Sequence, residues 1–160
     1  MALTDEKNIG TNIQDIDLSE TKKKQFRVNG DNNAILSLNT SDLSILSRLN
    51  KLYPKLQKLA GDAIAEMLPD TDDDSEEYIK KSAEVLEKID ADMRSALDEL
   101  FDANVSEVCA PSGTMYDPIN GKLRFEHIVD VLSGLYEQNL KKEMSLTTER
   151  ISKHTKKYTK

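Results

Sequence analysis

The sequence has no tryptophan, only one cysteine (Cys109) and few other aromatic residues among its 160 positions. A single cysteine cannot form an intramolecular disulfide, so nothing in the composition points to an oxidising compartment. With 38% hydrophobic and 32% charged residues, the apolar supply is enough for one modest core. We therefore expect one ordinary domain in a reducing cytoplasm, with some of the chain mobile outside the core.

Long hydrophobic runs are also missing. No stretch of about 18 consecutive apolar residues occurs, which is what a membrane-spanning helix needs. Residues 1–10 carry Asp5 and Glu6 and lack the basic segment and apolar run of a secretion signal. We expect neither a membrane-spanning segment nor export by that route.

Acidic residues outnumber basic ones, 29 to 22, although basic residues prevail at the C-terminal end. The net charge is −7, which argues against broad nucleic-acid binding because that affinity comes from basic groups that neutralise phosphates. From Lys141 onward, however, seven basic residues stand against two acidic ones. A segment without Lys or Arg holds the opposite charge: Asp62, Glu66, Asp70, Asp72, Asp73, Asp74, Glu76 and Glu77. The sequence therefore predicts a molecule with one acidic and one basic region.

Two short apolar segments flank a turn sequence near the N-terminus. Phe26 and Val28 alternate before residues 29–33, and Leu36 and Leu38 alternate after them. Asn-Gly at the start of this turn supplies the positive backbone angles of a tight hairpin. Such a hairpin is only marginally stable alone, so it should lie on helices or pair with another chain. Residues 1–23 hold only isolated apolar residues and should form a flexible arm.

Two segments then repeat apolar residues at helical spacing. The first follows Thr40-Ser41-Asp42, whose side-chain oxygens suit a helix start, and it contains Pro54, where we expect a kink or a break. The second starts at a capping-box-like pair, Asp74 and Glu77, and ends at Phe101. The apolar stripe of the first segment comprises Leu43, Leu46, Leu49, Tyr53, Leu56, Leu59, Ile64 and Met67.

The C-terminal third should hold a loop and a last helix. Residues 102–124 contain two prolines, a Ser-Gly pair and an Asn-Gly pair, which indicates a structured loop with one turn of helix around 105–109. A third helical stripe covers 125–140, and the basic tail, 141–160, should be helical only when a partner covers it. The predicted fold is mainly α: about three to four helices and a small N-terminal β-hairpin in residues 24–140, with mobile termini.

No pattern of catalytic or metal-binding residues emerges. Residues 70–74 are rich in aspartate, but a calcium-binding EF-hand would need Gly and Glu where Ser75 and Lys81 stand. Cys109 and His127 could be imagined as nucleophile and base, yet no third group is placed to orient the imidazole. We therefore expect no enzyme activity, no cofactor and no metal, and a function in protein binding.

The basic tail leaves three interpretations open. It could dock on an acidic protein surface, remain a solvated tail or bind nucleic acid. Tyr158 is its one aromatic residue, which leaves no stacking platform for the bases of a single strand, so docking on protein is favoured. Self-association belongs to the first interpretation, since the acidic region of one copy could meet the basic tail of another.

Three stretches of the sequence resemble the small tail assembly chaperones of long-tailed (siphovirus-type) phages and prophages of Gram-positive bacteria. They are residues 24–42 from the hairpin into the first helix, residues 89–102 at the end of the second helix, and residues 108–118 (Val-Cys-Ala-Pro-Ser-Gly-Thr-Met-Tyr-Asp-Pro) before the last helix. With the lysine-rich end they span most of residues 24–160. The arm before the hairpin is longer than the pattern of these chaperones.

The resemblance implies a non-catalytic protein of the host cytoplasm that binds the tape measure protein, recruits major tail protein (tail-tube) subunits and self-associates. The alternative is a virion structural or connector protein that pairs with neighbouring subunits through its arm and hairpin. Membrane contact is not expected and nucleic acid is an unlikely partner. The predicted protein-binding residues are Phe26, Val28, Leu132, Leu135, Tyr136, Leu140, Lys153, Lys156 and Lys157. Each apolar one could instead belong to the core, and each lysine could be solvated.

Overall fold

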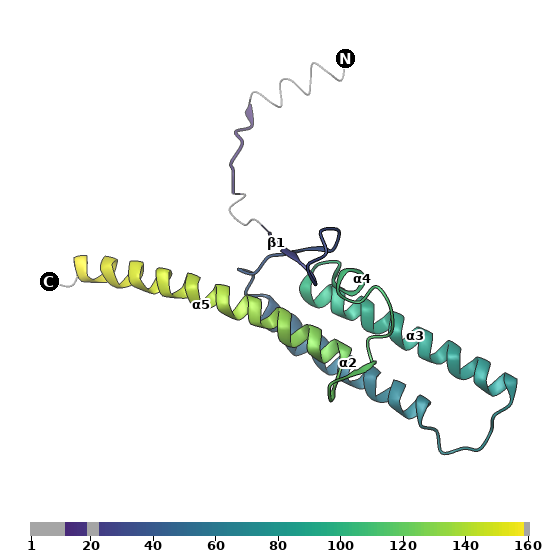
Figure 1. Ribbon diagram of the computed structural model, residues 1–160. Helices are drawn as coiled ribbons and strands as arrows, with labels where there is room; N and C mark the ends of the chain where they lie inside the picture. Colours follow the sequence, from purple (N-terminus) through teal and green to yellow (C-terminus); the bar gives the residue numbers. More distant parts are fainter. Residues whose placement is uncertain (1–11, 19–22, 159–160) are drawn as a thin grey trace, which may run out of the picture.

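Helices make up most of the structure, a computed structural model that describes residues 12–18 and 23–158, with side chains up to residue 153 (Figure 1). The mainly α fold with an N-terminal hairpin is as predicted. In chain order the described elements are β1 (Lys24–Arg27), β2 (Ile35–Leu38), α2 (Ile45–Met67), α3 (Glu76–Phe101), α4 (Val105–Cys109), β3 (Pro118–Ile119), β4 (Lys122–Leu123) and α5 (Arg124–Tyr158).

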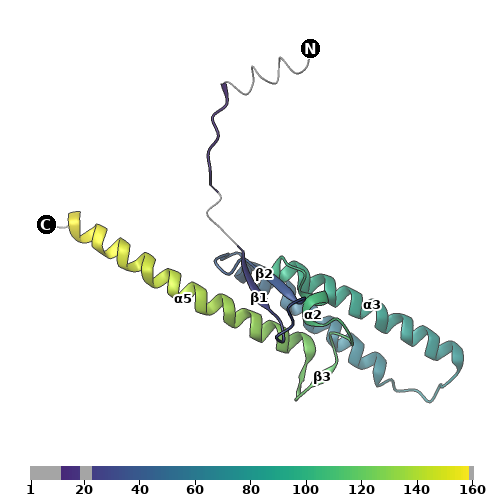
Figure 2. The same cartoon turned by 45° about the horizontal axis from the view of Figure 1, so that its top comes forward.

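The core lies where α2, α3 and the first half of α5 meet under the hairpin (Figures 1 and 2). Aromatic rings join α5 to both other helices: the ring centroids of Tyr53 and Phe125, and those of Phe101 and Tyr136, are 6.0 Å apart. Contacts of this kind add to the free energy gained by apolar burial. The largest fully buried side chains include Leu36, Leu38, Ile45, Leu56, Met93, Leu97, Leu100, Phe101, Val105, Met115 and Phe125.

The first hairpin follows its sequence pattern. β1 and β2 are antiparallel with Phe26 opposite Leu36, and Asn29 and Gly30 both have positive φ, 53° and 72°. Leu36 and Leu38 are buried, while Phe26 and Val28 are half-buried. The prediction of a hairpin with one apolar face on the helices is therefore confirmed.

Helix α2 differs from its predicted form in two ways. It runs from Ile45 to Met67 without a break, so Pro54 lies inside a continuous helix. Its buried face is made partly of alanines, Ala60 and Ala63, where the predicted stripe had Ile64 and Met67. Small side chains let a neighbouring helix approach closely, but a stripe of large apolar residues does not mark their positions. Leu43, Leu46, Ile64 and Met67 of the predicted stripe are exposed.

The N-cap of helix α3 lies one residue later than predicted. Ser75 is the N-cap, and its hydroxyl accepts a hydrogen bond from the Tyr78 amide at 3.2 Å. Asp73 accepts from the Ser75 amide at 3.0 Å, so the acidic loop caps the turn before the helix. The predicted pair of Asp74 and Glu77 does not form this cap. The helix ends at Phe101, and its C-cap residue Asp102 has a left-handed φ of 49°.

The segment between α3 and α5 contains the expected helical turn and one unexpected hairpin. Helix α4 confirms the turn at residues 105–109. The two-residue strands β3 and β4 flank Asn120 and Gly121, both with positive φ. The Asn-Gly pair has the geometry of a two-residue hairpin, a signal that could have predicted this element.

Helix α5 continues well past the core. Its 35 residues correspond to about 52 Å of helix. Buried side chains stop at Asn139, and the second half of α5 extends past the other elements in both views (Figures 1 and 2). The tail is thus helical in the structure of a single chain, whereas the sequence suggested that a partner is required. No helix of the described part of the chain is long and apolar enough to cross a membrane.

The expected N-terminal arm is described in part. Residues 13–18 form neither helix nor strand and are exposed. Residues 1–11 and 19–22 lie outside the described residues.

Candidate functional site

Four of the predicted contact residues line one groove. Phe26 and Val28 from the hairpin face Leu132 and Leu135 from α5 across a groove of about 530 Å³. Its other lining residues come from the same elements and from the loop before α5: Arg27, Asn29, Leu36, Cys109, Ile119, Arg124, His127, Ile128 and Val131. We call this the hairpin groove. Leu132 is also part of the buried core, whereas Phe26, Val28 and Leu135 are half-buried at its edge.

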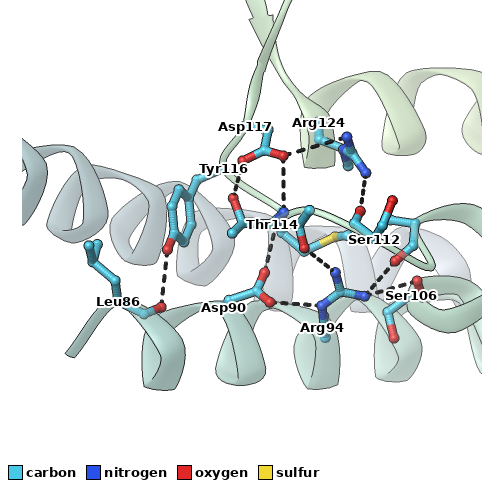
Figure 3. A network of polar contacts seen from close by, with 12 residues as sticks. Leu86, Asp90, Arg94, Ser106, Ser112, Thr114, Tyr116, Asp117 and Arg124 are labelled. Atoms are coloured by element: carbon cyan, nitrogen blue, oxygen red, sulfur yellow. Dashed lines mark hydrogen bonds and ion pairs between the residues drawn. The ribbon is translucent and has the colours of Figure 1, made fainter. Parts of the chain in front are cut away.

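A clamp on α3, the ion pair of Asp90 and Arg94, holds the segment between α3 and α5. Asp90 accepts hydrogen bonds from the Met115 amide at 2.7 Å and from Arg94 Nε at 2.9 Å (Figure 3). Arg94 donates in turn to the carbonyls of Ser106, Ala110 and Gly113, at 2.8–3.1 Å. One ion pair therefore bonds to four backbone groups, one in α4 and three in the loop after it. Charge-assisted bonds of this kind are stronger than neutral ones, and here they fix residues 106–115 against α3.

A second set of bonds joins the same loop to the start of α5. Arg124 donates to the Ser112 carbonyl at 2.6 Å and lies 3.5 Å from an Asp117 oxygen (Figure 3). Asp117 also accepts from the Thr114 hydroxyl at 2.5 Å, and this bond is the main cause that lowers the pKa of the Asp117 carboxyl. The first turn of α5 is thereby held against the loop that borders the groove.

A second groove lies between the start of α2 and the middle of α5. It has a volume of about 440 Å³ and an almost wholly apolar lining. Leu46 and Met144 are 62% and 54% exposed, and the predicted contact residue Leu140 is half-buried between them. Tyr136, also predicted as a contact, reaches this groove but is 3% exposed and belongs to the core. The remaining lining residues are Ile45, Leu49, Ser133, Glu137 and Lys141. We call this the tail groove.

A buried asparagine of α5 makes polar contacts with the hairpin segment that the sequence did not reveal. Asn139 is buried and donates to the Thr40 carbonyl at 3.2 Å and to the Ser41 hydroxyl at 3.0 Å, while its own oxygen accepts from Lys24. These bonds tie α5 to both ends of the hairpin. Their partners lie about a hundred positions apart in the chain, so no local pattern could have indicated them.

The predicted lysine contacts are only partly described. Lys153 is exposed and pairs with Glu149 at 3.4 Å, a helical i,i+4 pair. Exposed pairs of this kind contribute little to stability, so Lys153 is available to another partner at small cost. The side chains of Lys156 and Lys157 lie outside the described residues.

Cys109 and His127 lie in the same groove without the contacts of a nucleophile and its base. Both line the hairpin groove, and no hydrogen bond joins them among the described residues. Burial raises the pKa of the Cys109 thiol, and the Asp98 carboxylate raises it further. At neutral pH the thiol is therefore protonated, which is the opposite of an activated nucleophile. In the described part of the chain no three His, Cys, Asp or Glu side chains gather closely enough to hold a metal ion.

No protein-family model, curated protein or solved structure matches the chain. What the geometry offers is two apolar grooves and a long projecting helix, all of which are suited to binding polypeptide.

Proposed function

We propose that this chain is a non-catalytic assembly chaperone that holds a helical client protein along the tail groove and the projecting half of α5. The observation that carries the proposal is the continuity of apolar side chains beyond the core. The tail groove opens at Leu46 and Met144, and Ile151 lies two turns further along the same helix with 55% of its surface exposed. Residues spaced by three, four or seven positions on one helix form a single apolar stripe. Such a stripe can bind the apolar face of an amphipathic client helix.

The charges beside this stripe indicate the chemistry of the client. Lys141 lines the tail groove, where it pairs with Glu137 at 2.9 Å. Lys142, Arg150 and Lys153 are exposed along the same half of α5 and outnumber Glu143 and Glu149 there. A client helix with an apolar stripe and acidic flanks would match this surface in both respects. Long coiled-coil proteins have this character, because charged residues flank their apolar seams.

The resemblance in sequence layout gives the proposal its specific form. It makes the client the tape measure protein of a siphovirus-type phage tail, with the major tail protein recruited to the same complex. The protein then acts in the host cytoplasm while the tail is built. Covering the apolar seam of a long client would limit its aggregation before tail-tube subunits surround it.

A binding experiment with charge-introducing variants tests the proposal. The purified full chain is mixed with the tape measure protein encoded beside it, and the dissociation constant is measured by calorimetry. Leu46→Asp and Met144→Asp place a charge in the tail groove and should each weaken binding at least about tenfold. Ile79→Asp is the matched control, because Ile79 is 57% exposed on α3 and lies outside the groove. Equal affinity for all three variants would refute the proposed surface, and no binding by the unmodified chain would refute the client.

The second candidate is a virion structural or connector protein. It is favoured by the hairpin, because β1 pairs with β2 on one edge and nothing pairs with its other edge among the described residues. A strand of a neighbouring subunit could add to that edge. Peptide mapping of purified particles separates the two functions, since a connector is present in a fixed number of copies and a chaperone that leaves the finished tail is not.

A further inference from the structure

The outer edge of β1 and the hairpin groove beside it form one continuous surface. The edge offers unpaired backbone N–H and C=O groups, which are a template for a further strand. The groove beside it runs along α5, where Val131 is 52% exposed and Leu135 is half-buried. An added strand could therefore bond to β1 and place apolar side chains on α5 at the same time.

The charge of this surface is positive in a chain whose net charge is −7. Arg27, Arg124 and His127 line the hairpin groove, and its lining residues include no Asp or Glu. Arg124 is already held by the Ser112 carbonyl and Asp117. In the described part of the chain Arg27 has no carboxylate partner, so it is the cation best placed to meet a new one. The surface fits an extended segment that alternates apolar and acidic residues.

Residues 15–18 of the same chain have this alternation. Their sequence is Asp-Ile-Asp-Leu, and Ile16 and Leu18 are 78% and 75% exposed. Period-two alternation is typical of a strand with one apolar face. Burial of exposed apolar side chains of this size stabilises the folded state.

The connection to β1 has the right length for an antiparallel hairpin. Residues 19–23 separate Leu18 from Lys24, and hairpin loops of two to about five residues are the common lengths. Pairing Leu18 with Lys24 puts Ile16 opposite Phe26, and directly opposed residues share a face of the sheet. The same register puts Asp15 opposite Arg27.

We propose that residues 15–18 bind the outer edge of β1 as a third antiparallel strand, with Ile16 and Leu18 in the hairpin groove and Asp15 beside Arg27. The apolar face of this strand covers Val131 and extends the two-stranded sheet to three strands. The arm thereby protects an edge that would otherwise attract strands of other chains. This inference is independent of the client-binding surface, which lies on the tail groove.

Amide hydrogen exchange of the full chain, read by mass spectrometry, tests the proposal. The amides of the segment 15–18 should exchange at least about tenfold more slowly than those of an unstructured peptide. Asp15→Arg and Arg27→Asp should each remove this protection, and the double variant should restore it because the pair is reversed. Asp5→Arg is the matched control, with the same change of charge in the same arm outside the proposed register. Unchanged exchange in α3 shows that each variant is folded.

Two results would overturn the proposal. Exchange of residues 15–18 at the rate of an unstructured peptide, equal in all variants, would show that the strand does not form. Protection that increases with protein concentration would show that the edge binds the arm of a second copy, contrary to the intramolecular pairing. Neither result bears on binding of a helical client by the tail groove.

Discussion

At the scale of single residues, Gly113 is the most constrained position in the loop that borders the hairpin groove. Its φ is +78°, and a Cβ atom there would lie 2.4 Å from an Asp117 carboxylate oxygen. We expect Gly113→Ala to lower the free energy of unfolding by about 1–3 kcal/mol, because it adds backbone strain and displaces Asp117. Urea denaturation measures the change.

Gly61→Ala is the matched control for this substitution. Gly61 lies in α2, and a Cβ atom there meets nothing within 4 Å. The alanine should therefore stabilise the protein by about 0.5–1 kcal/mol through its higher helix propensity. A Gly113 variant as stable as the unmodified chain would mean that the loop does not need this backbone conformation.

The carboxylate of Asp117 gives the same loop a dependence on pH. The hydrogen bond from the Thr114 hydroxyl lowers the pKa of Asp117 below its ordinary value of 3.8. A carboxyl group with a lower pKa in the folded state stabilises the fold above pH 3.8, and this stability is lost as the pH falls through the folded-state pKa. The contribution should therefore be complete at neutral pH.

Thr114→Val removes the hydroxyl and should raise the pKa of Asp117 towards its ordinary value. We expect the variant to be less stable than the unmodified chain at pH 6, and the difference to shrink in strongly acidic solution, where Asp117 is protonated in both. Urea denaturation at several pH values measures the two stabilities. A difference that stays constant with pH would show that the hydroxyl acts through packing and not through the carboxylate.

At the scale of elements, α2 contains a proline that removes one of its backbone hydrogen bonds. Pro54 is exposed within a continuous helix, where it removes the amide that would bond four residues back. Pro54→Ala should raise the free energy of unfolding by about 1–3 kcal/mol. Thermal denaturation followed by circular dichroism measures it. A destabilised variant would show that the proline ring itself is needed where α2 meets Val129 of α5, which lines the same surface depression.

Local patterns accounted for most elements because local physics determines them. Asn29 and Gly30 accept positive φ, and Leu36 with Leu38 alternates, so the first hairpin follows from adjacent residues. The large apolar residues in the second half of α3 mark its buried side in the same way, whereas Ile79 near its start is exposed. The exact start of α3 could not be predicted from these patterns, because Asp73, Asp74 and Ser75 all have side-chain oxygens that could cap it. A cap depends on which side-chain oxygen reaches a free amide, and spacing alone does not decide it.

The long-range polar contacts are beyond any reading of local sequence. Arg94 appears as an ordinary charged residue of an amphipathic helix, yet it donates to three backbone carbonyls from two other segments. Asn139 likewise appears as an ordinary polar residue and is buried beneath the hairpin. The hairpin groove could be anticipated in its apolar members, Phe26, Val28, Leu132 and Leu135, because alternation and helical spacing mark them. The clamp of Asp90 and Arg94 on α3 could not be anticipated from local sequence.

At the scale of the whole molecule, the two charged regions lie at opposite ends. The acidic loop between α2 and α3 is at one extremity and the basic end of α5 is at the other (Figure 1). Such separation favours head-to-tail contact between copies, since each molecule presents both signs at a distance from each other. The contact should be sensitive to salt, because exposed charges are screened within about 10 Å at 0.1 M ionic strength.

We therefore expect self-association that is clear at about 50 mM salt and largely lost near 0.5 M, as measured by sedimentation velocity. Replacing Asp72, Asp73 and Asp74 together by lysine should abolish it at low salt, because the basic tail then meets a region of its own sign. Replacing Glu84, Glu87 and Glu99 by lysine gives the same change of net charge along α3, away from the acidic loop, and should leave association largely intact. If both triple variants lose association equally, net charge and not the position of the charges governs it. If apolar contacts in the tail groove hold the copies together instead, added salt will leave the association unchanged and Met144→Asp will abolish it.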